Sequence, residues 1–380
     1  MMLSRHRHAL LVEGLKQRAD PLAASAHFQL YPLTATAPTD ELVVVHDFGP
    51  AQIDNDLGYH VVTELLPLLA AQRRRLDNGY SEQDWFERSV GDIVRSMAGN
   101  ERQAWRLFYA NTLNATQASA GLGQPPGRPT GAAHGFIGLF GAIYRYALDL
   151  IQALPAAAPP TVLDVATCFG FFPLLLARVG VSGGTLGDIT GCDLNPALMA
   201  FADDYARHDG LARVRFGVAD ILADDIEREL APLPARFDVV TALHLLEHLE
   251  CAQTGQAVAN LWRLTARRLI IAVPLEDAPD PRYGHRQVFD RERLLALGRA
   301  LGGRCEYFEY HGGWLISDRL AGKRDRPDRR RPHEKTATSK PVATHPKPPE
   351  EYPCCTQLPA SPAPSSASSP AITTSSAANG

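Results

Sequence analysis

The chain has 380 residues, and 45% of them are hydrophobic, which suits a globular protein with a sizeable core. Its net charge of -4 gives no whole-chain attraction to nucleic acid or to an anionic membrane surface. No run of about 18 apolar residues is present, and the apolar run at residues 9–12 is too short for a signal peptide, so we expect no membrane span. The six cysteines form no C-x-x-C pair, which excludes a zinc ribbon and fits the reducing cytoplasm.

The first region, residues 1–157, is predicted to be mostly helical with one short hairpin. The strand-like runs HFQLYPL and ELVVVHDFG flank a loop-like TATAPTD. Apolar residues then recur at helical spacing over residues 61–76, 81–98, 101–116 and 134–154, with Ser81 as an N-cap. We expect this region to act as a cap beside a substrate site or as a homodimer surface. Plain structural packing is the alternative.

Residues 158–320 alternate between strand-like and helical segments. The apolar runs are TVLDVA, GDITGCDL, RVRFGVAD, FDVVTAL and RRLIIAVP. Between them, helices are predicted over residues 172–180, 196–210, 224–233 and 244–266. This alternation predicts parallel strands covered by helices on both faces. RCEYFEYH and GWLISDRL, divided only by glycine, read as a terminal hairpin, which is not typical of a dinucleotide-binding dehydrogenase.

Residues 321–380 are rich in Pro, Ser, Thr and Ala and are predicted to be a disordered tail. Their first part carries six basic and two acidic residues over positions 323–331. Such a run can bind nucleic acid or an anionic surface, but a solvated tail is the simpler interpretation, and no clear nucleic-acid partner is predicted.

An aspartate closes each of the first three parallel runs. Asp164 precedes a turn of small residues, where a ligand could approach the backbone. Asp193 is placed to accept both hydroxyls of a ribose, and Asp220 is placed to meet an adenine amino group, with Ile221 covering the ring. Helix capping at strand–helix turns is the alternative role for any one of them.

These blocks, together with FDVVTALHLLEHL, resemble motifs I to IV of the class I S-adenosylmethionine-dependent methyltransferases. The resemblance implies an α/β fold with a seven-stranded Rossmann-like sheet whose last strand is antiparallel, and S-adenosyl-L-methionine as the cofactor. The cofactor-binding residues it implies are Asp164, Ala166, Cys168, Gly170, Asp193, Leu194, Asp220, Ile221 and Leu243.

The first loop departs from the family pattern. The family usually has D-x-G-x-G-x-G, but here Ala166 and Cys168 replace the first two glycines. The cysteine requires either a negative φ or a strained backbone. This departure is the ground for an alternative, a methyltransferase-like binding or scaffold protein without catalysis. An NAD-dependent oxidoreductase is a further alternative, but it requires G-x-G-x-x-G after the first strand, which is absent.

The segment from His244 to His248 also matches H-x-x-E-H, a zinc-binding pattern of metalloproteases. In those enzymes the motif lies inside a helix, whereas here a strand-like run leads directly into it. We therefore predict no metal site, and we expect Glu247 to face packing or a cap.

Three histidines past strand ends are candidate catalytic bases: His248, His285 and His244. For each, a hydrogen-bonded structural role is the alternative. The loop PDPRYGHRQVF around His285 is similar to the acceptor loop of bacterial small-molecule and sugar methyltransferases. No basic patch with interleaved aromatics and no N-P-P-Y sequence is present, so the predicted acceptor is a small molecule or glycan. The chain also loosely resembles the methyltransferases that act on the mycofactocin oligosaccharide.

Overall fold

The computed structural model describes residues 20–32, 42–72, 81–122, 135–155, 157–181 and 183–320. The predicted tail at residues 321–380 lies outside this part of the chain. None of the described helices is long and apolar enough to cross a membrane.

The first region opens with a small antiparallel sheet of three strands, β1 (Ala23–Ala24), β2 (Phe28–Pro32) and β3 (Leu42–His46). β2 and β3 pair with Leu30 opposite Val44, which confirms the predicted pairing of the two strand-like runs. Phe28 and Leu30 point into the core and are fully buried.

Helices make up the rest of this region. They are α2 (Asp56–His60), α3 (Leu66–Ala71), α4 (Glu82–Ser96), α5 (Glu101–Ser119) and α6 (Phe136–Gln152). Ser81 caps α4 as predicted, because its Oγ accepts from the Asp84 N–H at 3.1 Å.

The helix predicted over residues 61–76 differs from the structure. It begins earlier, at Asp56, and a π-helical turn, Val61–Leu65, separates α2 from α3. Pro67 lies in the first turn of α3. Since proline has no N–H, it cannot donate the bond that a continuous α-helix would require there.

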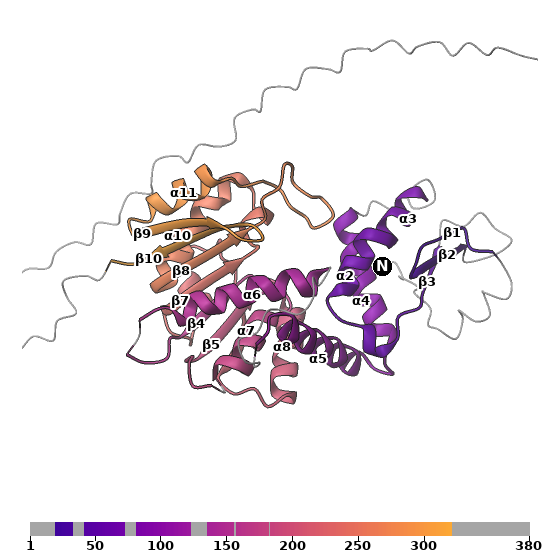
Figure 1. Cartoon of the computed structure of the whole chain (residues 1–380), viewed down its shortest axis with the longest axis horizontal. Helices are drawn as coiled ribbons and strands as arrows, with labels where there is room; N and C mark the ends of the chain where they lie inside the picture. Colours follow the sequence, from indigo (N-terminus) through magenta and orange to yellow (C-terminus); the bar gives the residue numbers. More distant parts are fainter. Residues whose placement is uncertain are drawn as a thin grey trace, which may run out of the picture. The chain divides into compact units, whose positions relative to one another are not determined.

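A seven-stranded sheet forms the second region, in the order β6-β5-β4-β7-β8-β10-β9 (Figure 1). Strands β4 to β8 of this sheet are parallel, and β10 is antiparallel to both of its neighbours. This confirms the predicted methyltransferase-like sheet with a reversed last strand. The strands are β4 (Val162–Val165), β5 (Ile189–Asp193), β6 (Val214–Val218), β7 (Phe237–Leu243), β8 (Thr265–Val273), β9 (Arg304–Glu309) and β10 (Gly313–Asp318).

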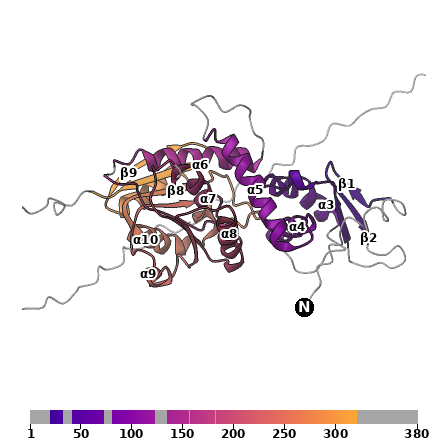
Figure 2. The ribbon, with the colours of Figure 1, turned by 90° about the horizontal axis from the view of Figure 1, so that it is seen from below.

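Helices cover both faces of this sheet, and α6 and α10 lie on opposite sides of it in Figure 2. The helices between the strands are α7 (Phe171–Leu176), α8 (Pro196–His208), α9 (Ile226–Glu229), α10 (Thr254–Leu264) and α11 (Arg291–Ala300). The strand interiors are almost fully buried, as expected for a sheet covered on both faces.

Two helical predictions are too long. The stretch 224–233 forms only the short α9, because Pro232 and Pro234 follow it closely and cannot donate helical hydrogen bonds. In the stretch 244–266, α10 begins only at Thr254, after 3-10 turns at Leu246–His248 and Cys251–Gln253.

Side chains of the first region pack directly on the second. Trp105 on α5 stacks on Phe201 of α8 with ring centroids 4.8 Å apart. The next residue on α5 is Arg106, and its guanidinium donates two hydrogen bonds to the Asp204 carboxylate, at 2.8 and 3.1 Å. The buried core is continuous from Phe28 to Ile316, so the helices of the first region form part of the same packed body. The boundary at residue 157 stays a prediction.

Candidate active site

The sheet order brings the three predicted aspartates to one edge. β5 lies between β4 and β6, so the carboxyl ends of these strands are neighbours. Asp164 is in register with Gly191, and Asp193 is in register with Val218, two residues before Asp220. Helix capping, the alternative role, does not apply at Asp193, because Asn195 caps α8 instead.

The loop after β4 has a left-handed backbone at every second residue. The φ angle is 57° at Ala166, 52° at Cys168 and 72° at Gly170. Cys168 therefore has the strained backbone and not a negative φ. A left-handed conformation costs about 1–2 kcal/mol for each non-glycine residue. The loop therefore keeps the shape of a glycine-rich turn although two glycines are replaced.

Asp193 holds this loop in place. Its Oδ2 accepts from the Cys168 N–H and its Oδ1 from the Asn195 N–H, both at 2.9 Å. An ionised carboxylate has about four acceptor sites, so acceptor capacity remains for further donors. Gly170 closes the loop where no side chain fits, because a Cβ there would lie 2.5 Å from the Phe216 ring.

Asp164 is nearly buried, with 4% of its surface exposed. Burial raises its pKa to about 6, although the nearby Thr167 and Thr241 hydroxyls oppose the rise. The Thr241 hydroxyl donates to Asp164 Oδ1 at 2.6 Å. Thr241 was not among the predicted site residues. The feature that could have identified it is a threonine inside the mostly apolar strand FDVVTAL.

Apolar side chains are exposed beside the ends of β5 and β6. Leu194 is 64% exposed and Val218 is 49% exposed, whereas Ile221 is buried. A flat apolar ring resting on Leu194 and Val218 would remove this surface from water. The predicted residues around the aspartates thus offer a polar edge and an apolar face together, which fits a nucleoside. Leu243, at the end of β7, is only partly buried.

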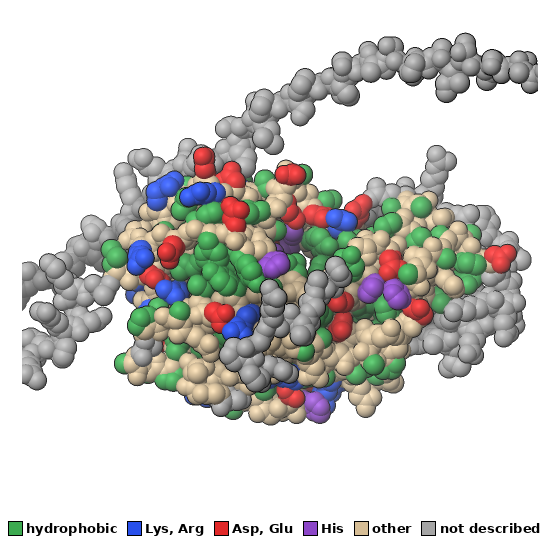
Figure 3. All heavy atoms as spheres, in the orientation of Figure 1, with side chains coloured by type: hydrophobic (Ala, Val, Ile, Leu, Met, Phe, Trp, Pro, Cys, Tyr) green, Lys and Arg blue, Asp and Glu red, His purple; other side chains and the backbone are tan. Residues whose placement is uncertain are grey.

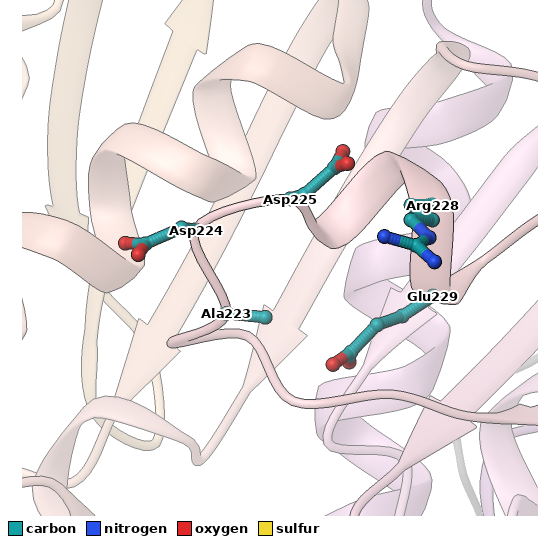
Figure 4. Close-up of a pocket in the computed structure, with 5 residues that line it drawn as sticks. All are labelled: Ala223, Asp224, Asp225, Arg228 and Glu229. Carbon is teal, nitrogen blue, oxygen red and sulfur yellow. The ribbon is translucent and has the colours of Figure 1, made fainter.

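Asp220 precedes the segment that lines a hollow of about 410 Å³ beside α9 (Figure 4). Its N–H donates to Glu229 Oε2 at 2.6 Å, and its Oδ1 accepts from the Leu222 N–H at 2.8 Å. The hollow is lined by Ala223, Asp224, Asp225, Arg228 and Glu229. None of these was predicted as a site residue, although Ala223 and Glu229 both form hydrogen bonds with Asp220.

The three predicted histidines lie together beyond the ends of β7 and β8. His244 follows β7 with a φ of 60°, and His248 lies in the 3-10 turn after it. His285 comes from the loop after β8, and its ring centroid lies 4.9 Å from that of His248. Figure 3 shows histidine side chains gathered beside acidic ones at separate places on one face.

Two glutamates lie among these histidines. His285 Nδ1 is 2.8 Å from Glu276 Oε2, a partner that was not predicted. Glu247 is fully buried, and neither carboxylate oxygen has a hydrogen-bond partner, so it does not cap a helix. Its Oε1 lies 3.1 Å from His244 Nδ1. Burial lowers the pKa of His248, which keeps that imidazole neutral at pH 7.

Aromatic residues of the first region line this histidine cluster. Phe86 on α4 and Phe136 on α6 both contact the Tyr283 ring, with centroids 6.0 and 5.8 Å apart. Phe140 on α6 contacts His244 at 5.6 Å. The loop after β8 extends toward the helices of the first region in Figure 1, and its contacts with α4 and α6 fix it there.

Comparison with known families supports the interpretation from the sequence. Residues 162–268 match the family described as a methyltransferase domain. The sequence thus contains the pattern of a methyltransferase domain. This match covers the blocks around Asp164, Asp193, Asp220 and His244, and it agrees with the S-adenosylmethionine cofactor expected from them. Among curated protein sequences, none matches the chain.

Several solved structures are similar to part of this chain. An S-adenosylmethionine-dependent methyltransferase from Aquifex aeolicus is 17% identical, with a TM-score of 0.36, covering 47% of this chain and 89% of its own. Magnesium protoporphyrin IX methyltransferase from Synechocystis PCC 6803, with bound S-adenosylmethionine, is 16% identical, with a TM-score of 0.38, covering 59% and 99%. The YcgJ protein from Bacillus subtilis is 19% identical, with a TM-score of 0.34, covering 43% and 70%. At these values the similarity carries no argument about the acceptor.

Proposed function

We propose that this chain is an S-adenosylmethionine-dependent methyltransferase that methylates a hydroxyl oxygen of a small molecule or sugar. The observation that carries the proposal is the pairing of two groups of residues along one edge of the sheet. Strand-end aspartates and a left-handed loop lie at β4, β5 and β6, and a histidine cluster lies beyond β7 and β8.

For the cofactor, we assign Asp193 to the ribose hydroxyls and Asp220 to the adenine amino group. Leu194 and Ile221 would contact the adenine ring, and the loop from Ala166 to Gly170 would face the methionine end. Three features support this assignment: the remaining acceptor capacity of Asp193, the exposed Leu194, and the left-handed loop. Asp164 would place negative charge near the cationic end of the cofactor.

Bound S-adenosylmethionine supplies a methyl group already activated on a sulfonium. The protein must then orient a hydroxyl in line with that methyl and accept its proton. His285 suits the second task, since its Nδ1 faces Glu276 and its Nε2 is left to take a proton. His244 and His248, close by, would bind the acceptor or share this role.

The acceptor surface would include the helices of the first region. Phe86, Phe136 and Phe140 lie beside Tyr283 and His244, which supports a substrate-binding cap more than a remote dimer surface. A sugar would find hydrogen-bonding histidines and glutamates next to aromatic rings there. The mycofactocin oligosaccharide is a specific candidate acceptor of this class.

The alternative of an inactive, methyltransferase-like protein rested on the replaced glycines. Because Ala166 and Cys168 keep the left-handed conformation that glycine would adopt, the substitutions leave the loop's shape in place. We therefore favour the active enzyme.

The test is methyl transfer by the purified full chain to a panel of sugars and small hydroxyl compounds, read by mass spectrometry. We expect a gain of one methyl group that depends on S-adenosylmethionine. His285→Gln should lower the rate by about 100-fold if it acts as the base, whereas His208→Gln, at the exposed end of α8, should not. Failure of the wild-type chain to bind S-adenosylhomocysteine in calorimetry would contradict the proposal.

A further inference from the structure

We propose that Glu247, His248 and His285 bind a divalent transition-metal ion, which holds the acceptor hydroxyl and makes it more acidic. Binding of the ion is argued from the described residues alone. Its role in catalysis rests on the proposed methyltransferase function. The proposal revises the sequence-based expectation that the site holds no metal.

The three side chains offer a compact set of donors. One ligand atom from each, a carboxylate oxygen and two imidazole nitrogens, lies within 4.8 Å of the others. Two histidines and one carboxylate form a set that binds Zn²⁺, Fe²⁺, Mn²⁺ or Co²⁺ and leaves positions open for substrate. The set differs from the protease pattern, which would use His244 with His248. The third ligand here comes from a loop 37 residues further along the chain than His248.

Glu247 is the strongest evidence for a cation site. This carboxylate is fully buried, and neither of its oxygens has a hydrogen-bond partner. His244 Nδ1 lies 3.1 Å from Oε1, without the geometry of a hydrogen bond. A buried carboxylate that accepts no hydrogen bond and has only an imidazole close by is unfavourable, and a metal dication would supply both charge and ligand bonds.

One of the two histidines is oriented as metal ligands usually are. His285 directs Nδ1 to Glu276 at 2.8 Å, so that Nε2 is left for a ligand bond. The His248 ring lies beside it, with the two ring centroids 4.9 Å apart. A carboxylate or carbonyl on the second ring nitrogen fixes the tautomer and direction of a metal-binding histidine.

The loop that carries His285 is held tightly in place. Gly284 has a φ of 76°, and a Cβ there would lie 2.3 Å from Gln83 Oε1 on α4. Contacts of Tyr283 with Phe86 and Phe136 fix the same loop from the first region. The third ligand is therefore positioned by tertiary packing before any ion arrives.

A second cluster provides a comparison within the same chain. His27, His60 and Glu64 also lie close enough to share an ion. Their polar atoms already have partners, because Glu64 accepts from the His27 N–H at 2.9 Å and contacts His60 Nδ1 at 2.9 Å. His27 Nδ1 contacts Asp47 at 2.9 Å. This cluster is partly exposed and satisfied, so it serves as the control.

The proposed ion would act as follows. Held by Glu247, His248 and His285, it would be a Lewis acid that lowers the pKa of an acceptor hydroxyl, as for a metal-bound water. The proton passes to His244 or to solvent. The oxygen then forms a bond to the methyl carbon while the carbon–sulfur bond breaks, giving the methyl ether, S-adenosylhomocysteine and one released proton. With the ion bound, His285 would be a ligand instead of the base assigned to it above, and His244 would accept the proton.

Metal binding is tested on the full chain, freed of metal with a chelator and without S-adenosylmethionine. Titration with Zn²⁺ in calorimetry, and with Co²⁺ by its visible absorption, should show one site per chain. Glu247→Gln should weaken binding by at least about 100-fold, and Glu276→Gln should weaken it by about 10–100-fold. Glu64→Gln should bind as the wild type does.

Thermal unfolding separates a ligand from a structural group. If Glu247 is a metal ligand, the metal-free Glu247→Gln protein should be at least as stable as the metal-free wild type. Zn²⁺ should no longer raise the Tm of this variant. A metal-free Glu247→Gln protein that unfolds at a lower temperature and still binds Zn²⁺ would overturn the proposal. So would loss of the site in Glu64→Gln but not in Glu247→Gln.

The two proposals fail in different ways. Methyl transfer that persists in chelator, with no Zn²⁺ bound, would remove the metal site and leave the methyltransferase function. Zn²⁺ binding that depends on Glu247, in a chain that binds no S-adenosylhomocysteine, would keep the site and remove the function.

Discussion

The two halves of the site are built in different ways. The half that we assign to the cofactor uses backbone and carboxylates at the ends of β4, β5 and β6, which follow one another in the chain. The half that we assign to the acceptor uses side chains from β7, a 3-10 turn, the loop after β8 and helices of the first region. The first half is held by hydrogen bonds to backbone, as at Asp193, and the second by side-chain packing, as at Tyr283 against Phe86 and Phe136.

This difference indicates how each half tolerates change. A loop tied by backbone bonds can accept Ala166 and Cys168 in place of glycine and keep its shape. A cluster of mutually packed side chains has no such tolerance, because each group fixes the next. The predictions below test this contrast, from the largest expected effect to the smallest.

Asp193→Ala should have the largest effect. It removes the carboxylate that we place on the ribose and also the acceptor for the Cys168 N–H. At about 1.5–3 kcal/mol for a hydrogen bond to a charged group, S-adenosylhomocysteine should bind about 100-fold more weakly in calorimetry. Asp188 precedes the amino end of β5, away from the proposed site. Asp188→Ala is therefore the control and should bind S-adenosylhomocysteine as the wild type does. Equal affinities for both variants would refute the cofactor half.

Tyr283→Ala should affect only the acceptor half. It removes two aromatic contacts, each worth about 0.5–1.5 kcal/mol, that hold the His285 loop against α4 and α6. We expect kcat/KM for the acceptor to fall about tenfold while the affinity for S-adenosylhomocysteine is unchanged. Tyr307→Ala on the edge strand β9 is the matched control. A parallel loss of cofactor affinity would show that the two halves are not separable.

The affinity for S-adenosylmethionine should depend on pH through Asp164. Burial raises the pKa of this carboxyl to about 6, so it is protonated below that pH and loses its attraction for a cation. Affinity should therefore rise about tenfold between pH 5 and pH 7. In Asp164→Asn the dependence should vanish. Thr241→Val, which removes a bond that lowers this pKa, should move the midpoint to higher pH.

Cys168→Gly should have the smallest effect. Glycine relieves the left-handed strain at φ 52°, about 1–2 kcal/mol, but it also adds about 0.5–1 kcal/mol of unfolded-state entropy. Thermal unfolding should show a Tm equal to that of the wild type or a few degrees higher. Cys168→Val, with a β-branched side chain in the same backbone region, should lower Tm by several degrees. A stable valine variant would mean that the loop is not constrained as described.

Much of the fold could be predicted because its signals are local. The alternation of apolar strands with helices gave the parallel sheet, and the glycine between two strand-like runs gave the terminal hairpin. Where the predicted helix bounds were wrong, a proline or a residue with positive φ set the observed bounds. Pro67 divides the helix predicted at 61–76, and Pro232 shortens the one predicted at 224–233. His244, at φ 60°, prevents a helix from starting directly after β7.

By itself, the sequence determined which carboxylates meet in the site. Asp164, Asp193 and Asp220 each lie within two residues of the end of a strand, and parallel strands bring their carboxyl ends to one edge. Only the tertiary structure decided that Cys168 stays in a glycine conformation, because the Asp193 carboxylate across the strand end compensates for the strain. Only the tertiary structure, too, placed Glu247, buried and without a hydrogen bond, beside His248 and His285. Those contacts join residues far apart in the chain through side-chain packing, and no periodicity in the sequence records which distant side chains meet.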